Sequence, residues 1–91
     1  MAKKHYLEVG GKYLIQTVNF IFLGEVVSLE WDMVEMKSTS IIYDTGKLVD
    51  FLKSGKANAS EYFNETIYFQ RANILTIIPW KRELPTESNL R

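Results

Sequence analysis

Few side chains in this 91-residue sequence are of types that carry catalytic or metal-binding chemistry. There is no cysteine, so a thiolate nucleophile, a disulfide framework and a cysteine-based metal site are excluded. The single histidine, His5, lies near the start of the chain, where we expect it to be solvated. No Ser-His-Asp set and no glycine-rich phosphate loop is present. We therefore expect no metal and no cofactor, and a binding or scaffold module rather than an enzyme.

One carboxylate has a catalytic interpretation and a structural alternative. Asp44-Thr45-Gly46 follows the apolar residues Ile41-Ile42-Tyr43, and this order resembles the active-site loop of retroviral-type aspartic proteases. The resemblance implies a homodimer in which the Asp44 of each chain shares one proton across the dimer axis. In this chain Lys47-Leu48-Val49 follows the glycine, where those proteases carry a small residue and further acids. We therefore expect Asp44 to cap a helix instead.

The composition predicts one globular domain over residues 1–91, with a core at 12–80 and a polar tail at 81–91. Apolar residues make up 46% of the chain and aromatic residues 13%, which is typical of a folded domain. The apolar run from Thr17 to Leu29 is interrupted by polar residues and is too short to span a bilayer. No uninterrupted apolar segment follows the first lysines, as a secretory signal would require. We expect a cytoplasmic protein without a membrane partner.

Charge is balanced in total but uneven along the chain. Eleven basic residues match eleven acidic ones, yet residues 13–36 contain four acids and no base. These acids are Glu25, Glu30, Asp32 and Glu35. Nucleic-acid affinity comes largely from clustered lysine and arginine that neutralise phosphates. The distribution therefore predicts that any RNA binding is weak.

The first half of the chain predicts three strands. We expect them at residues 12–18, 20–30 and 33–43. The first alternates side chains between two faces, and turns are expected at Asn19 and at Trp31-Asp32. Gly24 is costly inside a flat strand, so it predicts a bend or bulge where the sheet curls.

After residue 43 the spacing of the apolar residues changes from that of a strand to that of a helix, which predicts a helical insert at about 44–64. Leu48, Phe51 and Leu52 have the spacing of one apolar helical stripe. Asp44 or Thr45 is placed to cap a helix at 45–54, and Gly55 is placed to end it in the left-handed conformation. Residues 56–64 are polar and small, so we expect a loop there.

The segment 66–79 contains two runs of β-branched and aromatic residues that predict strands, separated by Arg71-Ala72-Asn73. This strand, Arg-small-Asn break and second strand resembles the second conserved motif of Sm-like (LSm, Hfq-like) small β-barrels. Gly24 matches the glycine of the family's curled second strand. The resemblance implies a mainly β fold: a small, five-stranded, strongly bent barrel, here with a short helical insert between strands three and four. Three features depart from the family: Ala72 in place of glycine, no Asp-x-x-x-Asn turn between strands two and three, and the helix-bearing insert at 44–64.

The resemblance also implies candidate binding residues. In Sm-like rings the turn that matches Arg71 and Asn73 lines the RNA-binding pore, where Arg71 would stack on a base or pair with a phosphate and Asn73 would read a base edge. The alternative is that Arg71 forms an ion pair between subunits and Asn73 only makes the turn. Trp31 could act as a stacking platform for a base. Because acids flank Trp31, a packing role is favoured.

We therefore place protein–protein assembly first among the functions. In the resembling family, strand four of one subunit pairs with strand five of the next, so the partner is a second copy of the chain. The corresponding segments here are nearly uncharged, and uncharged edges recruit partner strands. The predicted interface comprises Tyr68, Phe69, Ile74, Leu75 and Ile77. Another protein as partner, and single-stranded RNA at Arg71, Asn73 and Trp31, remain the alternatives.

Overall fold

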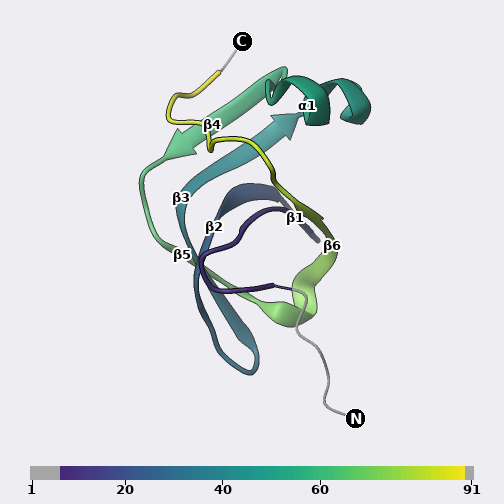
Figure 1. Cartoon of the computed structure of the whole chain (residues 1–91). Helices are drawn as coiled ribbons and strands as arrows, with labels where there is room; N and C mark the ends of the chain where they lie inside the picture. The colour runs from purple at the N-terminus through teal and green to yellow at the C-terminus, as the bar shows by residue number, and fades with distance from the viewer. Residues whose placement is uncertain (1–6, 90–91) are drawn as a thin grey trace.

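The computed structural model describes residues 7–89, which form one antiparallel sheet and a short helix (Figure 1). The elements are β1 (Lys12–Thr17), β2 (Ile21–Leu29), β3 (Met33–Asp44), α1 (Leu48–Ser54), β4 (Ala59–Phe63), β5 (Ile67–Gln70), the 3-10 turn η1 (Arg71–Asn73) and β6 (Ile74–Pro79). The prediction of a mainly β fold is confirmed. The expectation for His5 lies outside the described residues.

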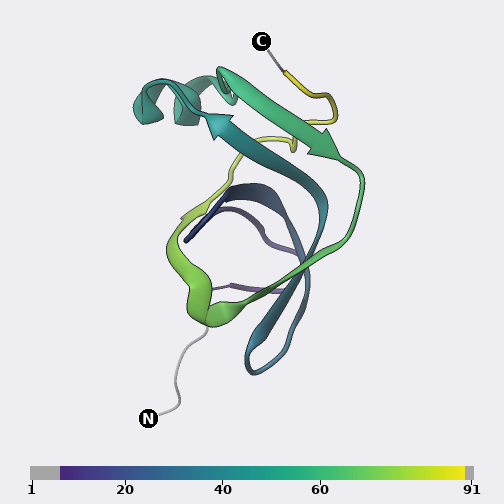
Figure 2. The same ribbon diagram turned by 180° about the vertical axis from the view of Figure 1, so that it is seen from behind.

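The sheet has the strand order β4-β3-β2-β1-β6, and β5 pairs with β3 as well. Residues Met33–Met36 of β3 pair with β5, whereas Thr39–Asp44 pair with β4. Residues 7–89 therefore contain six strands rather than the five expected. Within the described residues β5 does not pair with β6, so the sheet is not closed into the small, strongly bent barrel that was expected. Figure 2 shows from behind how β3 bends as it passes from one partner strand to the other.

A bulge in β3 produces this bend. Gly24 of β2 lies opposite two residues of β3, because the register shifts between the pairs Leu23–Ser40 and Glu25–Lys37. A Cβ atom at Gly24 would lie 2.9 Å from Met36 Cε and 3.0 Å from the Lys37 carbonyl oxygen. Ser38, one of the two bulged residues, has a φ of 52°, which is rare for a residue with a side chain. The predicted bend at Gly24 is therefore confirmed.

The bent sheet separates two apolar clusters. The hairpin-side cluster comprises Leu7, Tyr13, Ile15, Val26, Val34 and Met36. The helix-side cluster comprises Leu14, Leu23, Ile42, Phe51, Ala57 and Trp80. β1 contributes alternate residues to the two clusters, as the alternation of its sequence predicts. Both faces of this strand are therefore buried, which places β1 at the centre of the fold.

Helix α1 is shorter than predicted and has a different start. It begins at Leu48, and its N-cap residue, Lys47, makes no side-chain capping bond. The predicted caps are wrong because an intervening turn uses both side chains: the Gly46 N–H donates to Asp44 Oδ1 at 2.8 Å, and the Thr45 hydroxyl donates to the Gly46 carbonyl. The predicted end is confirmed, because Gly55 is left-handed (φ 76°) and its N–H donates to the Phe51 carbonyl.

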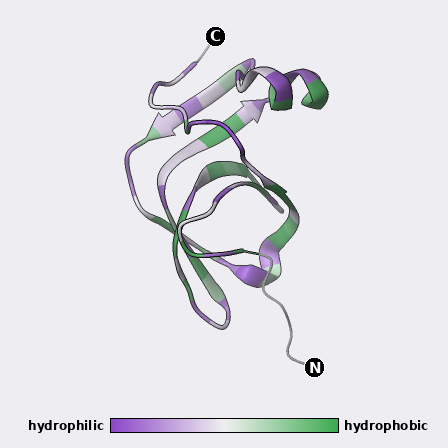
Figure 3. Cartoon of the chain, in the orientation of Figure 1, coloured by the Kyte–Doolittle hydropathy of each residue, from purple (hydrophilic) through white to green (hydrophobic). Residues whose placement is uncertain are grey.

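Two segments expected to be loop or tail are part of the packed structure. Ala59–Phe63 forms β4, because the backbone of the second half of β3 is available to pair with it. Trp80 is only 5% exposed and packs against Phe51 with ring centroids 5.2 Å apart. The segment after β6 is mostly hydrophilic (Figure 3), yet Leu84 packs against the helix-side cluster. The expected separation between a core ending at residue 80 and a tail with little packing is therefore wrong.

Candidate functional site

Strand β5 is an uncovered edge of the sheet. Its one partner in the described part of the chain is β3, paired from Met36–Ile67 to Met33–Gln70. Tyr68 is 64% exposed, whereas Phe69 is half-buried and packs against the hairpin-side cluster. The strand contains no charged residue and no proline. It therefore presents the features of an edge that another strand can extend.

Strand β6 is the second uncovered edge. It pairs with β1, and the Trp80 N–H, just after the strand, donates to the Lys12 carbonyl at 2.9 Å. Backbone groups alternate in direction along a strand, so those of Ile78 also face β1 and those of Ile77 face away from it. A register shift leaves Leu75 without a residue opposite it in β1, and Pro79 has no N–H. These two residues bracket the short stretch of β6 that another strand can join.

The outer edge of β4 differs, because the chain itself covers it. The Ser60 N–H donates to the Asn89 carbonyl and the Asn89 N–H donates to the Ser60 carbonyl, both at 2.8 Å. The Tyr62 N–H donates to Ser88 Oγ at 2.9 Å, and Asn89 Nδ2 donates to the Ala57 carbonyl at 2.8 Å. Of the sheet's lateral edges, those of β5 and β6 are therefore the uncovered ones among residues 7–89.

The structure divides the five predicted interface residues into two groups. Tyr68 and Leu75 are 64% and 62% exposed. Phe69, Ile74 and Ile77 are half-buried and pack against the hairpin-side cluster. The second group therefore supports the edge strands from within, and its members are poor positions for testing an interface by mutation.

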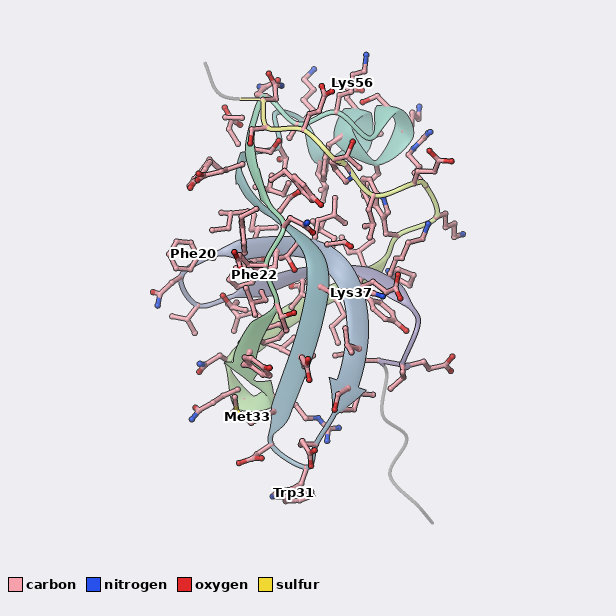
Figure 4. All side chains as sticks on the ribbon, turned by 90° about the vertical axis from the view of Figure 1, so that its left-hand side faces the viewer. Phe20, Phe22, Trp31, Met33, Lys37 and Lys56 are labelled. Atoms are coloured by element: carbon pink, nitrogen blue, oxygen red, sulfur yellow. The ribbon has the colours of Figure 1, made fainter. Side chains whose placement is uncertain are left out.

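An aromatic row that the sequence interpretation missed lies beside β5. Phe22 of β2 stacks on Phe69 with ring centroids 5.7 Å apart, and Phe20 lies 5.8 Å from Phe22. Phe20 is 49% exposed, and Figure 4 shows it at the margin of the molecule with Phe22 next to it. These residues are distant from β5 in the sequence, so no local pattern indicates that they extend its apolar surface.

The three predicted RNA-binding residues lie at one end of the molecule. The Arg71 N–H donates to the Asp32 carbonyl at 2.8 Å, which joins η1 to the β2–β3 turn that carries Trp31. Trp31 is 84% exposed, so the packing role favoured from the sequence is wrong. Figure 4 shows its ring at the tip of the hairpin. Arg71 is half-buried and Asn73 is exposed.

Asp44, the aspartate of the protease alternative, is exposed at the end of β3. Its carboxylate accepts the Gly46 N–H within one tight turn. No group of three or more His, Cys, Asp or Glu among residues 7–89 is arranged to hold a metal ion. No helix in the described part of the chain is both long and apolar enough to cross a membrane.

Comparisons with known proteins do not identify a relative. The chain matches no protein-family model, no curated protein and no solved structure at a significant level.

Proposed function

We propose that this protein is a homo-oligomeric, Sm-like binding or scaffold module that assembles by strand-edge pairing, with β5 of one copy adding to β6 of the next. One observation carries the proposal: β5 and β6 are uncovered and uncharged, whereas the chain covers β4 with its own backbone. The motif at 66–79 supports the same pairing through its resemblance to Sm-like proteins.

Pairing of this kind satisfies backbone and side chains together. A strand added to an edge receives main-chain hydrogen bonds, and side-chain contacts then give the pairing its register. Tyr68 and Leu75 contribute exposed apolar surface at the two edges. Because each copy carries one edge of each kind, the contact is heterologous, and it gives a ring when the rotation between copies closes.

Light scattering at micromolar concentration tests the proposal. Tyr68→Lys and Leu75→Lys each place a charge on one edge, and we expect each variant to have the mass of one chain while the unaltered protein is larger. Val49→Lys is the matched control, because Val49 is 61% exposed and belongs to α1, which is not one of the two edge strands. Ile77→Lys is less suitable, since it would also disturb the hairpin-side cluster.

A mixing experiment distinguishes edge pairing from general stickiness. Each lysine variant keeps one intact edge, so Tyr68→Lys and Leu75→Lys together should form dimers through the intact β6 of one and β5 of the other. A one-chain mass for the unaltered protein, or equal loss of assembly with Val49→Lys, would contradict the proposal.

Single-stranded RNA binding is the second candidate, favoured by the hydrogen bond that brings the Trp31 turn beside Arg71 and Asn73. An exposed indole is a suitable surface for base stacking. Glu30 and Asp32 flank the indole, so binding should be weak and should fade as salt rises. Electrophoretic shifts with uridine-rich and adenine-rich RNA at two salt concentrations test this, with Trp31→Ala as the variant. Tight binding at physiological salt that Trp31→Ala abolishes would place RNA binding ahead of assembly.

A further inference from the structure

The β2–β3 turn presents an apolar ring that neither the fold nor edge pairing uses. Trp31 is 84% exposed, the highest exposure among the large apolar side chains of residues 7–89. The turn is held by two backbone bonds, from the Glu30 N–H to the Met33 carbonyl and from the Arg71 N–H to the Asp32 carbonyl. The ring therefore sits on a defined support, with an acidic residue on each side of it.

A cleft with matching chemistry lies beside α1. It has a volume of 600 Å³ and is lined by Leu52, Ile78, Pro79, Trp80, Lys81 and Arg82. Its lining combines apolar side chains with two cations, and Arg82 is positioned by a bond from its Nε to the Leu52 carbonyl at 3.2 Å. Lys12 adds a third cation nearby, because its ammonium donates to the Arg82 carbonyl. Glu83 is the acid next to this group in the chain.

The turn and the cleft cannot meet within one molecule. Figure 4 shows Trp31 at the tip of the hairpin and α1, which contributes Leu52 to the cleft, at the opposite end. An indole flanked by two carboxylates complements an apolar cleft bordered by lysine and arginine in polarity and in charge. Because every copy carries both features, the chemistry fits a second copy of this chain.

We propose that Trp31 of one copy inserts into the Leu52–Trp80 cleft of the next, while Glu30 and Asp32 pair with Lys81 and Arg82. The contact is head-to-tail, so it propagates as a ring or a filament according to the rotation between copies. It uses neither Tyr68 nor Leu75, so variants at those two positions test edge pairing separately, although Ile78 and Pro79 of β6 also line the cleft.

Charge reversal with mixing tests the pairing. The variant Glu30→Lys/Asp32→Lys reverses the turn, and Lys81→Glu/Arg82→Glu reverses the cleft. We expect each alone to weaken the salt-sensitive part of self-association by about tenfold or more, measured by sedimentation at low and high salt. An equimolar mixture should regain association, because each turn then faces a cleft of opposite charge. If the mixture associates no better than the separate variants, Trp31 has another partner and the proposal is overturned.

Fluorine NMR can report directly on the environment of the Trp31 indole. The chain has two tryptophans, so fluorotryptophan labelling gives two fluorine NMR signals, which Trp31→Phe assigns. With rising protein concentration at low salt, the Trp31 signal should shift and broaden, and high salt should reverse the change. The Leu75→Lys variant, which blocks edge pairing, should keep this behaviour. A Trp31 signal that does not change with concentration would overturn the proposal, whatever the Trp80 signal does.

Discussion

The edge of β4 and the edges of β5 and β6 show two solutions to the same problem. An unpaired strand offers its backbone to any other strand. At β4 this edge is covered by Ser88 and Asn89, which form hydrogen bonds with the backbone of Tyr62 and Ser60. At β5 and β6 no described segment does so. The nine described residues that follow Trp80 cross to β4. The edges of β5 and β6 are therefore uncovered even though a following segment is available to cover an edge.

Replacing Trp80 with alanine should have the largest effect, because it removes the anchor of the segment that covers β4. The indole is 5% exposed and lies against Phe51, so the expected loss is about 3–5 kcal/mol in the free energy of unfolding, measured in urea. Trp31→Ala is the control at the exposed turn and should change the same quantity by about 0.5 kcal/mol or less. Similar losses in the two variants would contradict the distinction between the buried and the exposed indole.

Weakening the segment that covers β4 should change the hydrogen-exchange rate of individual backbone amides. Asn89→Ala deletes the bond from Asn89 Nδ2 to the Ala57 carbonyl, at a cost of about 1 kcal/mol to the local structure. Hydrogen exchange of the Ser60 amide, which donates to Asn89, should become several-fold faster. Thr86→Ala, in the same segment, should leave it unchanged. In a dilute sample the Ile77 amide should exchange fast in every variant, and strong protection there would show that β6 is not an uncovered edge.

Relieving the backbone strain at the bulge in β3 should have a smaller effect on stability, in the opposite direction. Ser38→Gly removes a side chain from a residue with a φ of 52°. The relieved strain of about 1–2 kcal/mol exceeds the added unfolded-state entropy of roughly 0.5–1 kcal/mol, so the variant should be slightly more stable. Ser28→Gly, in the extended part of β2, should be slightly less stable than the unaltered protein. The sign of the Ser38→Gly change in thermal unfolding decides whether the bend is strained.

The smallest expected effect is a titration across the covered side of the sheet. The Tyr43 hydroxyl donates to Glu61 Oε1 at 2.7 Å. This hydrogen bond, then desolvation, then the charge of Glu61 raise the pKa of Tyr43 above its ordinary 10.0. Because the neutral phenol is favoured in the folded state, any stabilisation is complete below pH 10 and is lost as the pH rises through the raised pKa. Glu61→Ala should lower that pKa toward its ordinary value, measured as the absorbance difference between Tyr43-containing and Tyr43→Phe proteins.

Local patterns predicted the central part of this fold because its signals are carried by neighbouring residues. The alternation in β1, the bend at Gly24 and the helix end at Gly55 each depend on a few adjacent positions. β4 was missed because Ala59–Phe63 has a weak strand pattern and pairs only where the second half of β3 is available. The Asp44 cap was wrong because the Gly46 N–H competes for the same carboxylate.

The site was only partly predictable for a related reason. The segment 66–79 identified the strands whose edges are uncovered, since their lack of charge is visible in the sequence. The cover over β4 depends on Asn89 meeting Ser60, and no feature of either residue indicates that pairing. The exposure of Trp31 depends on the rigid β2–β3 turn, and its flanking acids favoured the opposite expectation.

The pairing of β1 with β6 also has a consequence for the order of folding. β1 lies between β2 and β6 and contributes to both clusters, yet β6 comes from nearly the other end of the described chain. During synthesis on the ribosome, the β1–β3 meander can form early, but β1 stays unpaired on one side until residues 74–79 have emerged. A nascent chain at that stage exposes Leu14 and Ile15 beside an unpaired backbone. Exposed apolar side chains beside an unpaired strand favour aggregation, so the time for which the nascent chain is vulnerable depends on how quickly β6 is synthesised.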